Sequence, residues 1–362
     1  MKIAFVIDNP EFKGGAHVAT KALIEKLRAD GHQVDIVSPN FPKLGSFRFR
    51  IRQIFGHLHI GWFPDWTIDP KHKIRRMLAT YDTVCCLGEP SSCRMLVSNL
   101  PSYVRKVILI HTDYSTWRNF SPLAKEMSRF DRWWYARYDC IGVVGVENAK
   151  KMALALPKLT SKIKPFHNIF YKKPKPHVIE THEIPRIVTL MRVGDPPKKS
   201  ERYLNVVKHL KDCGIRFDWH VYGDGEQLEI YRTKCITLGI DDCLHFDGYT
   251  TDVMDKLSSA DLMVMLSVYE GLPNTIYESF LCGTPVFSTN VGGIAEQINE
   301  GKNGWIVENK EQVIVERLKF VLTEPKLLIG VSLNLRGYKY NNDIAYRELC
   351  DIIGVGNKIN KN

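Results

Sequence analysis

Short apolar runs recur along this chain and alternate with amphipathic segments. Near the start, the run Ile3–Ile7 is followed by a loop, and Val18–Leu27 then has its apolar residues at helical spacing. The run Val34–Val37 follows. Strand, helix and strand in this order predict a parallel sheet, because a crossover helix joins parallel strands. Three further runs are typical of buried strands of the same sheet: Thr83–Leu87, Val107–His111 and Ile141–Val144.

A second alternating series begins near Arg186. Between the two series, residues 173–185 are rich in Pro and Lys, a composition typical of an interdomain linker. The pattern therefore predicts two α/β domains, residues 1–172 and 186–339, with a ligand in the cleft near the carboxyl ends of their strands. The expected strands of the second domain are Ile187–Met191, Trp219–Tyr222, Leu244–Phe246, Leu262–Leu266, Pro285–Ser288 and Gly304–Val307, and its expected helices are Tyr203–Asp212, Gln227–Leu238 and Thr275–Cys282.

The composition agrees with a globular protein of two domains. The chain has 362 residues, of which 44% are hydrophobic and 25% are charged. No run approaches the roughly 18 apolar residues of a spanning helix, and no signal peptide is expected before the first strand. The nine cysteines include no Cys-x-x-Cys pair, so we expect free thiols in a reducing cytoplasm.

The positive charge lies in the first half of the chain. Residues 1–170 carry a net charge of +12 and the remainder carries −2. In the segment Phe47–Trp66, arginines alternate with aromatic and aliphatic residues, and Arg129–Tyr138 has a similar composition. These features favour an anionic membrane surface and a lipid-linked acceptor. A nucleic-acid partner would also use arginine and aromatic residues but ranks lower, and ordinary core aromatics with solvated arginines are the other alternative.

The stretch from Glu270 to Pro285 carries the most specific chemistry. Glu270 precedes a Gly-Leu-Pro-Asn turn, and Glu278 lies eight positions further on, inside an expected helix. A loop that opens a helix offers backbone N–H groups and the positive end of a dipole to a phosphate. Carboxylates beside it can accept hydrogen bonds from sugar hydroxyls. The stretch therefore indicates a nucleotide-sugar site, with two solvated surface glutamates as the alternative.

Five segments, taken in order, resemble the donor-binding half of the retaining GT-B glycosyltransferases of family 4, also described as glycosyl transferases group 1. The first half matches this family more loosely, through residues 13–38, His111 and Asn168. The resemblance implies two Rossmann-like domains that face each other across a cleft. The first would bind the acceptor, the second a nucleotide-sugar, and a helix at about 340–362 would cross back onto the first. The five segments are LMRVGDPPKKS (190–200), VYGDGEQ (221–227), HFDGYTTDV (245–253), residues 258–298 and NGWIV (303–307).

The resemblance also implies roles for individual residues. Glu278 would accept hydrogen bonds from the ribose, Glu270 would lie near the donor sugar, and Arg192 would hold the diphosphate. No Asp-x-Asp pair stands where this fold would place a magnesium ion, so cations must neutralise the leaving group. Pro196-Pro197-Lys198-Lys199 replaces the family's Lys-Gly, which leaves the choice between Lys198 and Lys199 open, with a slight preference for Lys198.

The remaining candidates come from both halves of the chain. His111 ends an expected strand and would hydrogen-bond a sugar hydroxyl or hold the acceptor, or it is a structural histidine at a strand end. Glu270, His111, Arg192 and Lys198 are the predicted catalytic group. Further donor-binding candidates are Gly15, Gly223, Tyr249, Leu272, Asn274 and Thr275.

The implied activity is the retaining, metal-independent transfer of a hexosyl unit from a nucleotide-sugar, with UDP-sugar favoured, to a glycan or lipid-linked acceptor. The expected setting is cell-surface polysaccharide or lipopolysaccharide biosynthesis, in the cytoplasm or on the inner membrane face, with no cofactor, metal or nucleic-acid partner. Two alternatives remain: a non-catalytic nucleotide-sugar-binding subunit of a glycosyltransferase assembly, and a GT-B enzyme of another class. The second includes an epimerase and an enzyme that glycosylates protein or nucleic acid; a phosphorylase would need a cofactor lysine context that the sequence lacks.

Overall fold

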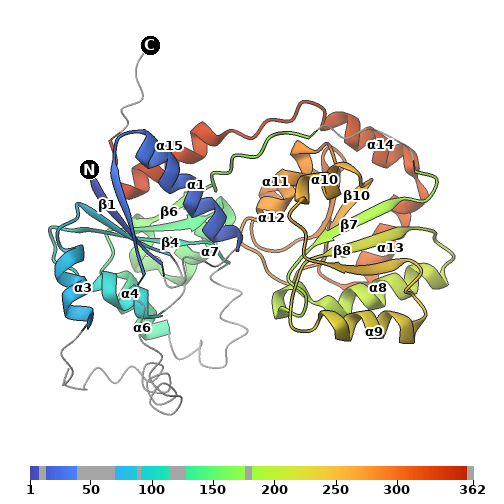
Figure 1. Cartoon of the computed structure of the whole chain (residues 1–362), viewed down its shortest axis with the longest axis horizontal. Helices are drawn as coiled ribbons and strands as arrows, with labels where there is room; N and C mark the ends of the chain where they lie inside the picture. Colours follow the sequence, from blue (N-terminus) through green and yellow to red (C-terminus); the bar gives the residue numbers. More distant parts are fainter. Residues whose placement is uncertain (8–13, 39–69, 88–90, 114–127, 176–181, 357–362) are drawn as a thin grey trace. The chain divides into compact units, whose positions relative to one another are not determined.

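The computed structural model describes residues 1–7, 14–38, 70–87, 91–113, 128–175 and 182–356 (Figure 1). The chain forms two compact units. The first combines Met1–Phe170 with Asn342–Asn362, and the second is Tyr171–Asn341. Each unit contains a six-stranded sheet in which every pair of neighbouring strands is parallel.

The sheet of the first unit has the strand order β2-β1-β3-β4-β5-β6. Its central strands are buried along their length except for Arg105 at the start of β4, which explains why they are visible as continuous apolar runs in the sequence. The strands predicted in this half are confirmed. The edge strand β6 was missed, because its sequence IKPF has no apolar run and only its last residue is buried. The strands are β1 Lys2–Val6, β2 Gln33–Val37, β3 Thr83–Leu87, β4 Arg105–Ile110, β5 Cys140–Val144 and β6 Ile163–Phe166.

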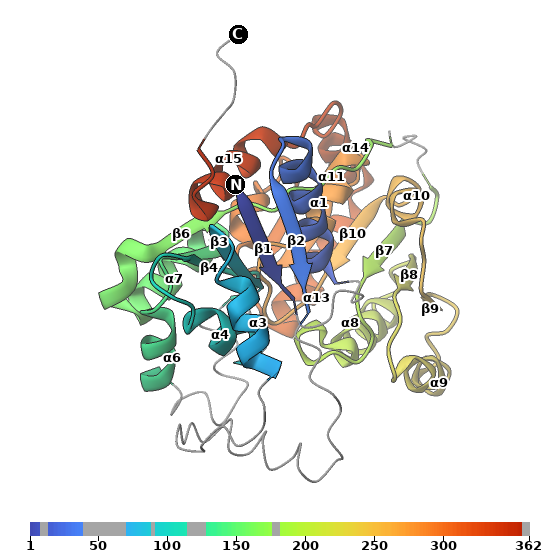
Figure 2. The ribbon, with the colours of Figure 1, turned by 60° about the vertical axis from the view of Figure 1, so that its left-hand side comes forward.

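Helices cover both faces of this sheet (Figure 2). Apolar residues of α3, α4, α6 and α7 form one core with the strands, and α1 and α15 pack on the opposite face. The helices are α1 Gly15–Ala29, α3 Pro70–Leu78, α4 Ser91–Ser98, α6 Ser128–Tyr135, α7 Val146–Ala155 and α15 Asn342–Ile353, with a 3₁₀ helix η3 at Pro157–Lys162.

The C-terminal helix α15 is tied to the first unit by hydrogen bonds as well as by packing. Arg105 Nη2 donates to the carbonyl of Ile352 at 2.9 Å, and Thr83 Oγ1 donates to the carbonyl of Ile353 at 3.1 Å. The helix approaches β5 at Gly142, where an added Cβ atom would lie 3.3 Å from Ile352 Cδ1. Because these contacts join residues far apart in sequence, the last helix is an integral part of the first unit.

The second sheet has the strand order β12-β11-β10-β7-β8-β9. From β7 the chain moves outward through β8 and β9, and it then returns to β10 and continues outward in the other direction. The strand order therefore reverses between β7 and β10, the position at which open α/β sheets bind ligands. The strands are β7 Arg186–Leu190, β8 Asp218–Tyr222, β9 Leu244–Gly248, β10 Leu262–Met265, β11 Val286–Thr289 and β12 Gly304–Val307.

The second unit also has helices on both faces of its sheet. The main core lies between the strands and α8, α9 and α13, with the fully buried Trp219 donating its indole N–H to Thr189 Oγ1 at 3.0 Å. Helices α10, α11 and α12 lie on the other face (Figure 1). The elements are η4 Pro196–Lys198, α8 Ser200–Asp212, α9 Leu228–Leu238, α10 Val253–Ser258, α11 Asn274–Leu281, α12 Ile294–Gln297, α13 Glu311–Thr323 and α14 Pro325–Asn334.

Two expectations from the composition concerned the cysteines and membrane-spanning helices. All nine cysteines are free thiols, and only Cys213 is exposed. None of the helices in the described ranges combines the length and the apolar character needed to cross a bilayer.

Shortening a buried side chain of α15 should destabilise the first unit. Leu349 is 2% exposed, and Leu349→Ala should lower the free energy of unfolding by about 2–5 kcal/mol, because it leaves a cavity in the core. Ile344→Ala, on the same helix but 45% exposed, is the matched control and should cost less than about 1 kcal/mol. Urea denaturation measures both, and equal effects of the two variants would contradict this role for α15.

Candidate active site

Lys198 and Glu270 meet where the strand order of the second sheet reverses. Lys198 lies in η4 beyond β7, and Glu270 lies in the loop beyond β10. Lys198 Nζ is 2.5 Å from Glu270 Oε1, and the same oxygen accepts a hydrogen bond from Ser267 Oγ at 2.6 Å. The two charged side chains are only 22% and 13% exposed. The structure therefore joins two residues predicted for the site and adds Ser267, which sequence reasoning missed.

The geometry of the Pro-Pro-Lys-Lys segment distinguishes its two lysines. Lys199 caps α8 in the left-handed conformation, with φ at +49°, and is exposed. Lys198, one residue earlier, is the lysine that contacts Glu270. Arg192 follows the carboxyl end of β7 with its side chain 56% exposed, and its Nε lies 3.9 Å from Asp195 Oδ1. Lys198 and Arg192 thus supply two cations beyond the same strand.

Close backbone contacts hold the loops of this edge together. An added Cβ atom on Gly292, whose φ is +58°, would lie 1.9 Å from the carbonyl oxygen of Glu270. The N–H of Gly293 donates to the carbonyl of Gly271 at 2.9 Å. On the other side, a Cβ atom on Gly223 would lie 1.6 Å from the Met191 carbonyl oxygen. Only glycine fits at these positions, so the loops after β7, β8, β10 and β11 form one connected rim.

Helix α11 begins directly behind the Glu270 loop. Its N-cap is Pro273, so no side chain caps its first turn, where Asn274 and Thr275 lie. The hydroxyl of Thr275 is buried and finds no hydrogen-bond partner among the residues that the structure describes. An uncapped helix start with a buried polar atom suits an anionic group.

Glu278 lies one turn into α11. Burial raises the pKa of its carboxyl group, and the charge of Lys172 opposes this shift in part. No hydrogen bond reaches this carboxylate from any residue in the described ranges. Glu278 is half-buried, so a ligand that supplies hydrogen-bond donors would compensate the partial desolvation of its charge. Of the other predicted donor residues, Leu272 is buried at 3% exposure and Tyr249, beyond β9, is 63% exposed.

In the first unit, His111 follows the carboxyl end of β4. Its ring packs edge-on against Phe166, with 5.2 Å between the centroids, and lines a small cavity with Leu109, Asn168 and Leu349. Burial lowers the pKa of His111 to about 4; the neighbouring Asn168 side chain opposes the shift in part, and the charge of His17 adds to it. Both ring nitrogens are buried and have no hydrogen-bond partner among the described residues. His111 is therefore neutral at physiological pH.

The other predictions for the first half of the chain concern Gly15 and the two basic, aromatic segments. Gly15 is the first residue of α1 and is exposed. The basic, aromatic segment Phe47–Trp66 lies outside the described residues. In the second basic, aromatic segment, the Arg137 guanidinium stacks 3.3 Å over the ring of Trp133, whose side chain is 49% exposed.

Two family models match the chain. Residues 13–157 match Glycosyltransferase Family 4, and residues 174–332 match Glycosyl transferases group 1. The Vi polysaccharide biosynthesis protein VipC/TviE of Salmonella typhi is 35% identical over 95 residues, 26% of this chain and 16% of that protein. The lipopolysaccharide core biosynthesis glycosyltransferase LpsE of Rhizobium meliloti is 36% identical over 86 residues, 24% of this chain and 25% of that protein. The chain thus spans a quarter or less of the length of these two relatives.

A solved structure extends the likeness to the whole chain. HepE of Anabaena, in complex with UDP-glucose, matches with a TM-score of 0.75 at 16% identity, covering 98% of this chain and 99% of that chain. At this identity, the likeness shows a common fold. The predicted fold class, two Rossmann-like parallel-sheet domains of the GT-B type, is confirmed.

The buried carboxylate of Glu278 should make stability depend on pH. Its pKa is higher in the folded protein than in the unfolded chain, so its contribution is favourable below the unfolded pKa and is lost as the pH rises through the folded pKa. We expect Glu278→Gln to be more stable than the wild type at pH 7, with the difference shrinking toward pH 4. Urea unfolding over a pH series measures this. The exposed Glu226→Gln should show no such trend, and a Glu278→Gln protein that is less stable at pH 7 would disprove it.

The imidazole of His111 should stay neutral over the working pH range. Because burial lowers its pKa to about 4, its NMR titration should have a midpoint near pH 4. His111→Ala identifies the signal. A midpoint above pH 6 would show that the ring is accessible to water and could carry a proton during the reaction.

Proposed function

Since this chain belongs to the glycosyltransferases of group 1 and family 4, we propose that it transfers a hexosyl unit from a nucleotide-sugar to a glycan or lipid-linked acceptor, with retention and without a metal ion. The UDP-glucose bound to HepE supports a UDP-sugar as the donor. The relatives named for Vi polysaccharide and lipopolysaccharide core biosynthesis support a role in building a cell-surface polysaccharide.

The observation that carries this proposal is the Lys198–Glu270 pair at the switch point of the second sheet. A cation and a carboxylate in contact there, beside an uncapped helix start, provide one group for a diphosphate and one for a sugar. Lys198 Nζ would exchange part of its contact with Glu270 for a diphosphate oxygen. Glu270, still held by Ser267, would then be free to accept a hydrogen bond from a sugar hydroxyl.

The ribose would complete the hydrogen bonding of Glu278. Its carboxylate is costly to bury alone, and two neighbouring hydroxyls of a ribose would supply the donors that the described protein residues do not. Binding of the nucleoside would thus remove a penalty that exists in the free protein. This explains why an acidic residue is placed where an apolar one would stabilise the fold better.

Lys198, Arg192 and the first turn of α11 would neutralise the charge that develops on the leaving diphosphate. In the retaining reaction, the bond from the anomeric carbon to the phosphate oxygen breaks while the acceptor oxygen bonds to the same face of that carbon. The leaving phosphate oxygen takes the acceptor proton, so no side chain has to act as the base. A neutral His111 fits this scheme as a hydrogen-bond partner for a hydroxyl.

The proposed acceptor and location are supported by the first half of the chain. Its net charge of +12 and its exposed aromatic and arginine side chains suit an anionic lipid surface, which supports a cytoplasmic enzyme working at the inner membrane face on a lipid-linked glycan. No cofactor beyond the donor substrate is proposed.

Replacing Lys198, Arg192 and Lys199 one at a time should test the donor site. Lys198→Ala and Arg192→Ala should each reduce turnover of the preferred UDP-sugar by about 10²–10³-fold, because each removes charge stabilisation from the leaving group. Lys199→Ala is the matched control and should stay within about threefold of the wild type, because Lys199 is exposed and the contact with Glu270 is made by Lys198. Release of UDP from a panel of UDP-sugars measures the effect.

Glu278→Ala tests binding of the nucleoside. It should abolish the rise in thermal midpoint that UDP produces in the wild type. Full activity of both Lys198→Ala and Glu278→Ala would refute the site. Donor binding without any hydrolysis or transfer would instead identify the chain as a nucleotide-sugar-binding subunit.

A further inference from the structure

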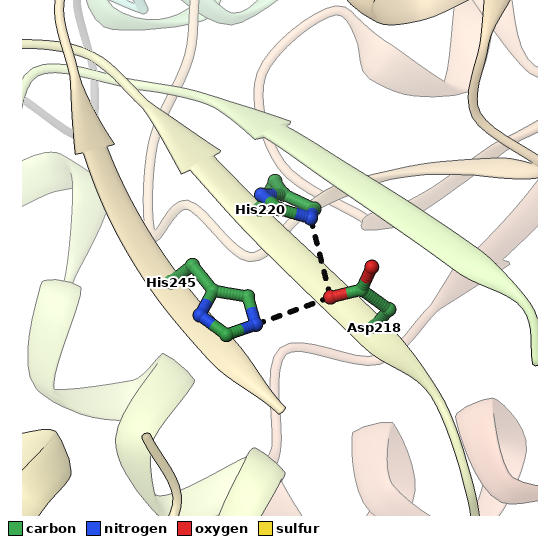
Figure 3. Close-up of side chains that lie close together, drawn as sticks. All are labelled: Asp218, His220 and His245. Atoms are coloured by element: carbon green, nitrogen blue, oxygen red, sulfur yellow. Dashed lines mark ion pairs between the residues drawn. The ribbon is translucent and has the colours of Figure 1, made fainter. Parts of the chain in front are cut away.

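A group of histidine and aspartate side chains lies on β8 and on the edge strand β9 of the second sheet. It is separate from the Lys198–Glu270 pair. Asp218 and His220 are on β8 and His245 is on β9 (Figure 3). Asp247 is also on β9. Trp219 on β8 is fully buried in the core, so its neighbours in sequence project from the opposite face. The four side chains are 31–38% exposed, which leaves them open to an ion from solution.

The distances within this group match the spacing of ligands around a metal. Asp218 Oδ1 lies 3.2 Å from His220 Nε2 and 3.2 Å from His245 Nε2. The three ligand atoms all lie within 4.8 Å of one another. In a tetrahedral zinc site with bonds of about 2.0–2.2 Å, neighbouring ligand atoms are about 3.3–3.6 Å apart. Two of the three separations are therefore already close to those of a bound ion.

Asp247 adds the outer support that metal-binding histidines usually have. Its Oδ2 lies 2.8 Å from His220 Nδ1, the ring nitrogen opposite the one that faces Asp218. A carboxylate in this position holds the N–H on Nδ1, fixes the ring and leaves Nε2 as the electron-pair donor. The group thus has three candidate ligands and a residue that orients one of them.

We propose that Asp218, His220 and His245 bind a divalent transition-metal ion of the zinc type, with Asp247 as the positioning residue for His220. Two imidazoles and one carboxylate suit zinc, and a water molecule would take the fourth position. Magnesium and calcium would be disfavoured, because they prefer oxygen ligands.

The place of the group in the fold indicates a structural role. Strand β9 is at the edge of the sheet, and its pairing with β8 shifts register between Val221 and Tyr222. An ion shared by His245 on β9 and two residues on β8 would tie the edge strand to its neighbour. The ligands come from the body of the strands, whereas the donor-site loops follow their carboxyl ends, so the ion would not take part in transfer.

The same side chains also form an ion-pair network in the absence of a metal. Hydrogen bonds that His220 donates to Asp247 and to Asp218 raise its pKa, because they favour the charged form of the ring. The experiment must therefore separate an ion from a proton at this position.

Titration of the full-length protein with Zn²⁺, in competition with a chromophoric chelator, makes this separation. Cys213→Ser should be the background, because it removes the exposed thiol as a zinc ligand. We expect one equivalent of Zn²⁺ that is lost in His220→Ala/His245→Ala and kept in His209→Ala, an exposed histidine on α8. Asp247→Asn should weaken the affinity by about 10–100-fold.

Two more readouts make the outcome unambiguous. Zn²⁺ should raise the thermal midpoint of the parent protein but not of the double variant, whose circular dichroism without metal shows whether it is folded. Asp218→Asn, which keeps the size of the side chain, repeats the test if the double variant fails to fold. Equal zinc affinity in parent and variants, or no binding by the parent, would overturn the proposal and leave an ion-pair network only.

Discussion

Backbone atoms pack against backbone atoms along the carboxyl edge of the second sheet, and the candidate site depends on this contact. Gly292 lies against the carbonyl of Glu270 and Gly223 against that of Met191, with no room for a Cβ atom at either position. Side chains can change rotamer, but a loop held at its backbone can move only with its neighbour. The contacts thus fix Glu270, and with it Lys198, relative to the strands that carry them.

Polar and charged groups at this edge lower the stability of the ligand-free protein. The half-buried carboxylate of Glu278 receives no hydrogen bond from the described residues, and Thr275 has a buried hydroxyl with no partner among them. Each would be more stable replaced by an apolar residue or paired with a donor. Binding sites commonly carry such penalties, because the ligand removes them. The location of unsatisfied groups is therefore informative about where a ligand is expected.

The sequence was most informative where one physical effect dominates. Buried parallel strands have no polar face, so β3, β4, β5 and most strands of the second sheet could be predicted from apolar runs alone. Which of Lys198 and Lys199 contacts Glu270 could not be predicted, because it depends on the local backbone of a Pro-Pro-Lys-Lys segment with one left-handed residue. Likewise, Asp218 and His245 lie 27 positions apart in sequence, and they come together only through the register of β8 with β9.

Helix α15 belongs to the first unit but follows the second unit in the sequence, and this order has a consequence during synthesis. The ribosome completes the whole second unit before it makes the helix that covers β4, β5 and β6. While the second unit folds, the first unit therefore lacks the helix that covers β4, β5 and β6 on the face where α15 packs. A nascent chain that stops short of Asn342 would carry a finished C-terminal domain and an unfinished N-terminal one, which is a substrate for chaperones and proteases.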